Sequence, residues 1–171
     1  MKHDQDKYGH DFQDGKRNGW ENDVGSPDGI LKSEEDGGRK NTFWSGKLEC
    51  KKLEYRPPHT FQPSLAKMFT LPGPKQERGS LFTSFKYRLH PLEEGEATTI
   101  RVVVTGNVSL GFSAFWIAPG APTGTWLQSD PIGVRYSGTR AHVLIGADYG
   151  EPGVSRKLDI DDIKVERVPD K

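Results

Sequence analysis

The stretch GSLFTSFKYRLH, residues 79–90, decides the fold class. Its apolar and aromatic residues share one parity, namely Leu81, Phe85, Tyr87 and Leu89. Polar residues hold the other parity, namely Ser84, Lys86 and Arg88. Because successive side chains of a strand point to opposite faces, this alternation predicts a long strand with one buried face.

Similar patterns recur on both sides of this strand. The run Ile100–Thr105 is β-branched throughout its centre, which is typical of a strand packed on both faces. Alternation returns in residues 110–116 and 143–147. About nine or ten strands are predicted in all, and they are centred near Phe12, Ile30, Leu48, Ala66, Phe82, Val102, Phe112, Trp126, Val143 and Lys164.

Helices are not expected, because 20 glycines and 12 prolines interrupt the 171 residues and no segment between them shows a helical apolar period. Many short strands separated by turns predict an all-β fold, a two-sheet antiparallel β-sandwich of the jelly-roll type. Residues 11–171 are expected to form this single domain. Residues 1–10 are charged and offer little to bury, so they are predicted to be disordered.

The last predicted strand contains a phase slip. Leu158 and Ile160 share one parity, whereas Ile163 and Val165 share the other. A β-bulge at Asp161 and Asp162 would return both pairs to the core. The two carboxylates would then be held either by backbone N–H groups or by a cation, and Asp161 is expected to be structural and not catalytic.

Composition excludes several classes of protein. Lys and Arg total 24, as do Asp and Glu, and no basic stripe interleaves with aromatics, so nucleic-acid binding is not expected. Cys50 is the single cysteine, which excludes a disulfide framework and a cysteine-rich zinc site. No apolar run reaches the ~20 residues of a membrane span. The motifs of common hydrolases and phosphate-binding enzymes do not occur, and the chain is predicted not to be an enzyme.

Three motifs resemble bacterial carbohydrate-binding-module-like jelly rolls, which are galactose-binding-like β-sandwiches. They are Asp11-Phe12-Gln13-Asp14-Gly15 followed by Asn18-Gly19-Trp20, then Ser45-Gly46-Lys47-Leu48, and finally Leu158–Val165 with its Asp pair. The resemblance extends from about Asp11 to Val168. It implies the sandwich fold without identifying a ligand, because this fold serves many functions.

The resemblance also implies a structural calcium ion on the side of the sandwich away from the ligand. Carried over to this chain, its ligands would be Gln13, the carbonyl near Lys47, and Asp161, joined by Asp11. The chain departs from the pattern at Gln13, where relatives often have Glu. An amide oxygen can coordinate calcium, but calcium prefers several carboxylates. The alternative is a bulge satisfied by hydrogen bonds alone.

Sugar rings stack on exposed aromatic side chains, so exposed aromatics are the candidate ligand-binding residues. Trp20, Trp116 and Trp126 are predicted to be core or structural residues. Trp44 and Tyr55 lie near polar loops, and they are predicted to stack against a neutral or weakly acidic oligosaccharide. Arg88 and Arg135 would donate hydrogen bonds to its hydroxyl groups.

Two main hypotheses for function follow. The first is a non-catalytic carbohydrate-binding module, a monomer that binds an oligosaccharide or polysaccharide and is not inserted in a membrane. It would belong to a larger extracellular or periplasmic protein whose leader has been removed, since Met1–Gln13 lacks the apolar stretch of a signal peptide. The second is a structural or protein-interaction sandwich of an envelope or signalling protein without a sugar site. A stand-alone lyase or hydrolase is a weaker third hypothesis.

Overall fold

A computed structural model shows an all-β protein built from two antiparallel sheets, which confirms the predicted sandwich. It describes residues 7–49, 62–91, 99–106, 110–116, 121–147 and 155–171, and twelve strands lie within them. In the described part of the chain, no helix is long and apolar enough to cross a membrane.

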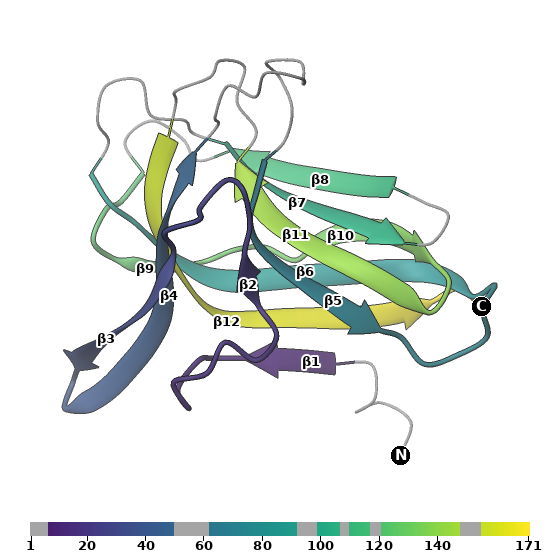
Figure 1. Ribbon diagram of the computed structural model, residues 1–171, viewed down its shortest axis with the longest axis horizontal. Coiled ribbons are helices and arrows are strands. Elements are labelled where there is room, and N and C mark those ends of the chain that lie inside the picture. The colour runs from purple at the N-terminus through teal and green to yellow at the C-terminus, as the bar shows by residue number, and fades with distance from the viewer. Residues whose placement is uncertain (1–6, 50–61, 92–98, 107–109, 117–120, 148–154) are drawn as a thin grey trace.

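The larger sheet has seven strands. Its main path runs in the order β10 (Ile132–Ser137), β6 (Arg78–Leu89), β12 (Ser155–Pro169), β4 (Arg39–Glu49) and β3 (Ile30–Asp36). Two short strands complete it, β1 (Lys7–His10) beside β12 and β9 (Trp126–Gln128) beside β6. The β3–β4 hairpin extends away from the rest of the sandwich (Figure 1).

The smaller sheet has five strands. They follow the order β2 (Glu21–Asn22), β5 (Gln62–Thr70), β11 (Arg140–Ala147), β7 (Thr99–Gly106) and β8 (Leu110–Trp116). Every strand pair in both sheets is antiparallel, and Figure 1 shows the two sheets face to face.

The core lies between the sheets and follows the alternation of the sequence. In β6, Leu81, Phe85 and Leu89 are fully buried, whereas Lys86 is exposed on the outer face. The facing sheet contributes buried residues from β5 (Leu65, Phe69) and from β11 (Ala141, Val143, Ile145). Trp20, in the loop just before β2, is buried with them. Trp20 packs edge-on against Phe69 with ring centroids 6.0 Å apart, which confirms it as a core residue.

The bulge predicted in the last strand is confirmed. Asp161 lies opposite Lys86 of β6, but the next paired residue, Lys164, lies opposite Ser84, so β12 has one residue more than β6 at this point. Asp162 adopts a φ of 48° there. The extra residue returns Ile163 and Val165 to the buried face that Leu158 and Ile160 occupy.

Two predictions about the N-terminal region are wrong. Residues 1–10 were expected to be disordered, but the described part of that range, Lys7–His10, forms β1, whose backbone pairs with Ile163–Glu166 of β12. Phe12 was expected at the centre of a strand, but it lies in a loop with a φ of 55° and its ring is buried. The pairing of β1 depends on a strand more than 150 positions away, which a local pattern of charges does not reveal.

Candidate functional site

A groove of about 490 Å³ lies on the outer face of the seven-stranded sheet, the face turned away from the core. We refer to it as the outer groove. Its lining comes from the loop after β1, the β3–β4 hairpin, β6, β9 and β12, with Gln13, Asp36, Arg39, Lys40, Asn41, Lys86, Trp126, Leu127, Gln128 and Asp161 as the residues. This volume is within the range of ligand pockets in proteins.

Strand register sets a row of polar side chains across the groove. Lys86 of β6 pairs with Gln128 of β9 on one side and with Asp161 of β12 on the other. Neighbouring strands lie about 4.8 Å apart, so an amide, an ammonium and a carboxylate succeed one another over about 10 Å. The row therefore presents both donors and acceptors on a rigid sheet.

Trp126 forms an aromatic wall of the groove. The residue is half-buried, and it lies outside the main core cluster. Its ring meets the ring of Phe43 edge-on, with centroids 5.3 Å apart and planes at 74°. The guanidinium of Arg88 lies 4.7 Å from the Trp126 centroid and 4.8 Å from the Phe43 centroid. Trp126 was predicted to be a structural residue, and these contacts lie on the outer face of the sheet and not in the core.

Arg88 is held in this position by two carboxylates. Its Nη1 donates to Oε1 of Glu34 at 2.7 Å, and its Nε donates to Oδ2 of Asp159 at 2.9 Å. Asp159 is almost fully buried, and its other oxygen lies 3.1 Å from Nε2 of His90. Burial opposes the charged form of Arg88, but the hydrogen bonds to Glu34 and Asp159 outweigh it and raise the pKa of Arg88.

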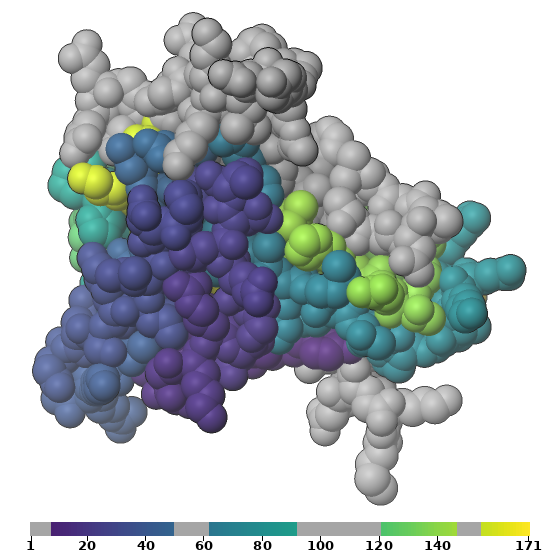
Figure 2. Space-filling view, viewed as in Figure 1, coloured from purple at the N-terminus to yellow at the C-terminus, as the bar shows by residue number. Residues whose placement is uncertain are grey.

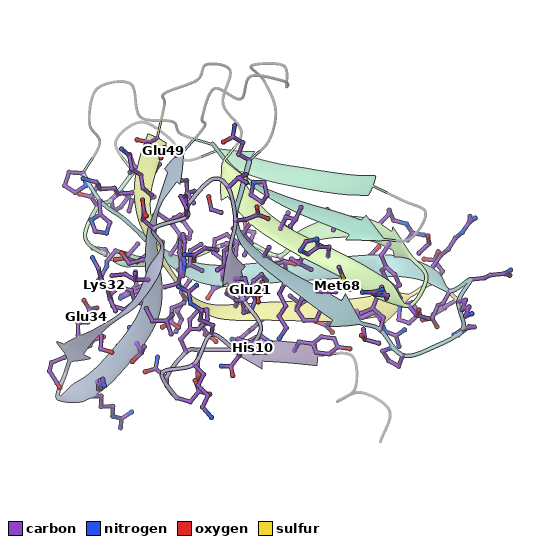
Figure 3. All side chains as sticks on the ribbon, in the orientation of Figure 1. His10, Glu21, Lys32, Glu34, Glu49 and Met68 are labelled. Atoms are coloured by element: carbon purple, nitrogen blue, oxygen red, sulfur yellow. The ribbon has the colours of Figure 1, made fainter. Side chains whose placement is uncertain are left out.

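A smaller cavity of about 190 Å³ lies beside this ion-pair cluster. Glu34, Arg88, Leu89, His90, Pro91 and Gly124 line it. Glu34 reaches it from β3, the strand at the edge of the hairpin (Figure 3). Arg88 therefore lines the small cavity and contacts Trp126, which lines the outer groove.

The prediction that Trp44 stacks against a ligand is wrong. Its ring is fully buried in the core, and its Nε1 donates to Oδ1 of Asn22 at 3.0 Å. Trp44 pairs with Ile160, and both side chains point inward. Glycines at positions 29 and 46 leave the space that the ring fills. Tyr55, its predicted companion, lies outside the described residues.

The two predicted arginines do not share one groove. Arg135 of β10 lies opposite Ser80 of β6, eight positions from Arg88, which corresponds to about 26 Å along a strand. Arg135 is exposed and forms a two-pronged ion pair with Asp170. Arg88 already donates hydrogen bonds to Glu34 and Asp159. Its guanidinium packs over the ring of Trp126 and so positions that ring.

The residues that the resemblance assigned to calcium are only partly brought together. Gln13 and Asp161 both line the outer groove, and the charge of Asp11 acts on Asp161. Lys47 lies opposite Lys157 of β12, four positions before Asp161, at a distance of about 13 Å. Its carbonyl accepts a hydrogen bond from the Ser26 hydroxyl. Within the described residues, no group of three His, Cys, Asp or Glu side chains could hold a metal ion.

Burial raises the pKa of the Asp161 carboxyl. Desolvation raises the pKa of this carboxyl to about 6, and the nearby charges of Asp162 and Asp11 act in the same direction. A hydrogen bond from the Asp162 backbone N–H, at 2.7 Å, and the charge of Lys86 oppose the shift without cancelling it.

Sequence reasoning missed most of the outer groove. The available signal was the short segment Trp126-Leu127-Gln128, in which an aromatic and an amide share one parity. That these two residues face Arg88 and Lys86 depends on the pairing of β9 with β6, across some 40 positions of sequence.

Comparison with known proteins supports the fold. No family model matches the sequence, and no curated protein matches it. The structure is similar to the CBM22-1 xylan-binding domain of Xyn10C from Paenibacillus barcinonensis, with a TM-score of 0.58 and 11% identity. That similarity covers 94% of this chain and 93% of the other. The chain thus has the jelly-roll β-sandwich fold of a carbohydrate-binding module.

Two further solved structures contain similar regions. One comprises the CBM22-1 and GH10 modules of Clostridium thermocellum xylanase 10B complexed with xylohexaose, with a TM-score of 0.47 and 13% identity. The other is a β-glucosidase from Paenibacillus barengoltzii, with a TM-score of 0.35 and 13% identity. These similarities cover 97% and 71% of this chain, but only 28% and 10% of the respective partner chains.

Proposed function

We propose that this chain is a non-catalytic carbohydrate-binding module whose outer groove holds a segment of a polysaccharide. The observation that carries the proposal is the half-buried Trp126 standing beside the row Gln128, Lys86 and Asp161. The similarity in fold to a xylan-binding domain supports it.

The chemistry of the groove suits a sugar. A pyranose ring has an apolar C–H face, which stacks on an indole, and a hydroxyl edge, which needs both donors and acceptors. Trp126 would supply the aromatic surface. Lys86, the NH₂ group of Asn41 and the carbonyl oxygen of Gln128 would bind hydroxyls, because the other halves of these two amides already bond within the protein. With one stacking ring, the affinity is expected to be micromolar to millimolar, about 4 to 8 kcal/mol.

The arrangement of carboxylates favours binding over catalysis. Glycosidases need two free carboxylates on either side of the scissile bond. Asp159 is buried between Arg88 and His90, and Glu34 is paired with Arg88. Asp161 accepts the N–H of Asp162 at the bulge. Each of these three carboxylates therefore has a structural partner.

A protein-interaction domain, the alternative hypothesis, would be expected to have a large exposed apolar patch. Among the described residues the exposed large hydrophobics are Val24, Ile30, Met68, Phe82 and Val168. Met68 lies on β5 of the other sheet (Figure 3), and only Phe82 and Val168 come from paired strands on one face. This scatter favours the glycan-binding hypothesis, which places the protein outside the cell or in the periplasm, where polysaccharides occur.

A binding screen tests the proposal. Plant, algal and bacterial polysaccharides, xylan among them, would be titrated by calorimetry into wild type, Trp126→Ala and Met68→Ala. We expect at least one polysaccharide to bind wild type, a loss of at least tenfold in affinity for Trp126→Ala, and unchanged affinity for Met68→Ala, whose side chain is exposed on the opposite sheet.

Two other outcomes would revise the proposal. If no polysaccharide binds wild type, the protein-interaction hypothesis replaces it. If binding survives in Trp126→Ala and is lost in Met68→Ala, the function stands but the site lies on the five-stranded sheet.

A further inference from the structure

The bulge in β12 marks a change of neighbours. Up to Ile160, β12 pairs with β4 on one side, and from Ile163 onward it pairs with β1 on that same side. Continuing the first register past the pair Ile160–Trp44 would set Asp162 opposite Thr42. Asp162 instead turns at a φ of 48°, so β12 does not supply the partner for Thr42.

Gln13 takes that place. Its Oε1 accepts the backbone N–H of Thr42 at 3.0 Å, and its Nε2 donates to the carbonyl of Thr42 at 3.1 Å. An antiparallel strand makes this same pair of bonds to a residue opposite it. The side-chain amide therefore acts as one rung of the ladder between the N-terminal segment and β4, which lie next to each other at the lower left of Figure 2.

The NH₂ group of Gln13 faces several oxygen atoms at once. Besides the Thr42 carbonyl, it donates to Oδ1 of Asn41 at 2.8 Å and to the carbonyl of Asp11 at 2.9 Å. Asp161 lines the same groove, and the charge of Asp11 acts on it. Neutral oxygens around Gln13 and a carboxylate in the same groove form an environment of the ligand types that a hard cation such as calcium binds. In this chain, an N–H donor group occupies the centre of that environment.

The donor set accordingly does not fit a calcium ion. The single amide oxygen of Gln13 already accepts an N–H, and the carbonyl of Lys47 lies elsewhere along β4. We infer that the amide of Gln13 closes this junction in place of a metal ion, and that Gln13→Glu would turn it into a calcium-dependent junction. In the variant, a carboxylate oxygen would replace the NH₂ group and face the other oxygens.

The test uses thermal unfolding and calorimetry and does not depend on glycan binding. Wild type, Gln13→Glu and Gln128→Glu would be unfolded in EDTA and in millimolar calcium. We expect the wild-type melting temperature to be the same in both, and that of Gln13→Glu to rise by about 5 °C or more with calcium. Gln128→Glu adds the same charge two strands away from Asp161 and should not respond.

Saturable one-site calcium binding to wild type would overturn the inference. So would a folded Gln13→Glu variant that ignores calcium, because the oxygens around residue 13 would then not form a cation site. If Gln13→Glu fails to fold in either buffer, calorimetry of wild type with calcium decides: absence of binding supports the inference, and one-site binding refutes it.

Discussion

Two tryptophans on opposite faces of the seven-stranded sheet are held by different interactions. Trp44 points into the core, where its ring is fully buried and its Nε1 donates to Asn22. Trp126 packs on the outer face, where it contacts Phe43 and the guanidinium of Arg88. Phe43 and Trp44 are consecutive in β4, so strand alternation places the Phe43 side chain on the outer face, beside Trp126, and the Trp44 side chain on the inner face.

The two tryptophans differ in whether a ligand can reach the ring. The inner ring is fixed by close packing, which excludes any ligand. The outer ring is fixed by a cation that is itself held by Glu34 and Asp159, and it is half-buried at the wall of the groove. Charges thus hold an aromatic surface in place without burying it completely, as a preorganised binding site requires.

Trp44→Ala should have the largest effect on stability. Removing a buried tryptophan leaves a cavity, and such truncations cost about 3–5 kcal/mol. Urea unfolding of this variant and of Trp126→Ala measures the difference directly. Equal losses in the two variants would contradict the contrast between the inner and outer rings.

Asp159→Asn should have the next largest effect. Breaking a buried ion pair costs roughly 3–5 kcal/mol, and the lower end is expected here because Arg88 keeps its bond to Glu34. Asp170→Asn is the matched control, because it removes the carboxylate partner of the exposed Arg135 and should change the unfolding midpoint little. If both variants lose the same stability, Arg88 does not depend on its buried partner.

Most of the fold follows from local patterns. Alternation in 79–90 and the phase slip at Asp161 predict β6 and the bulge in β12, because side-chain parity is a property of each strand alone. The strands β1, β2 and β10 were missed. Of these, β1 is a short, polar strand that owes its conformation to a distant partner.

The candidate site was far less accessible to sequence reasoning. Trp44 stands among polar residues in the sequence, yet parity within β4 sends it inward. Arg88 and Arg135 look equivalent as outward residues, yet one is enclosed by two rings and two carboxylates and the other is exposed. These differences depend on which strands pair with one another, and strand pairing cannot be deduced from the local sequence pattern.

Asp161→Asn should stabilise the protein at neutral pH. Because the folded-state pKa of Asp161 is raised from 3.8 to about 6, the folded state binds this proton more tightly than the unfolded chain does. The wild-type free energy of unfolding should therefore fall as pH rises from about 4 to 6, by roughly 1–3 kcal/mol. The sequence predicts a structural role for Asp161, whereas the raised pKa predicts that its negative charge opposes folding at neutral pH.

Denaturant unfolding of wild type and Asp161→Asn between pH 4 and pH 8 checks this. The two proteins should be similar near pH 4 and diverge above it, with the variant more stable at pH 7.5. A variant that is less stable than wild type at pH 7.5 would show that hydrogen bonds to the charged carboxylate outweigh its burial.

Trp126→Ala should have the smallest effect on stability and still weaken polysaccharide binding at least tenfold. The ring loses one edge-on contact with Phe43 and one cation–π contact with Arg88, which together amount to about 1–2 kcal/mol. Arg88 keeps both carboxylates, so the wall behind the ring stays in place. Trp126→Phe should recover part of the affinity, because a smaller ring still offers an apolar face. If Trp126→Ala unfolds as readily as Trp44→Ala, the outer ring stabilises the fold as much as a core residue does. The outer groove would then not be a preorganised binding surface.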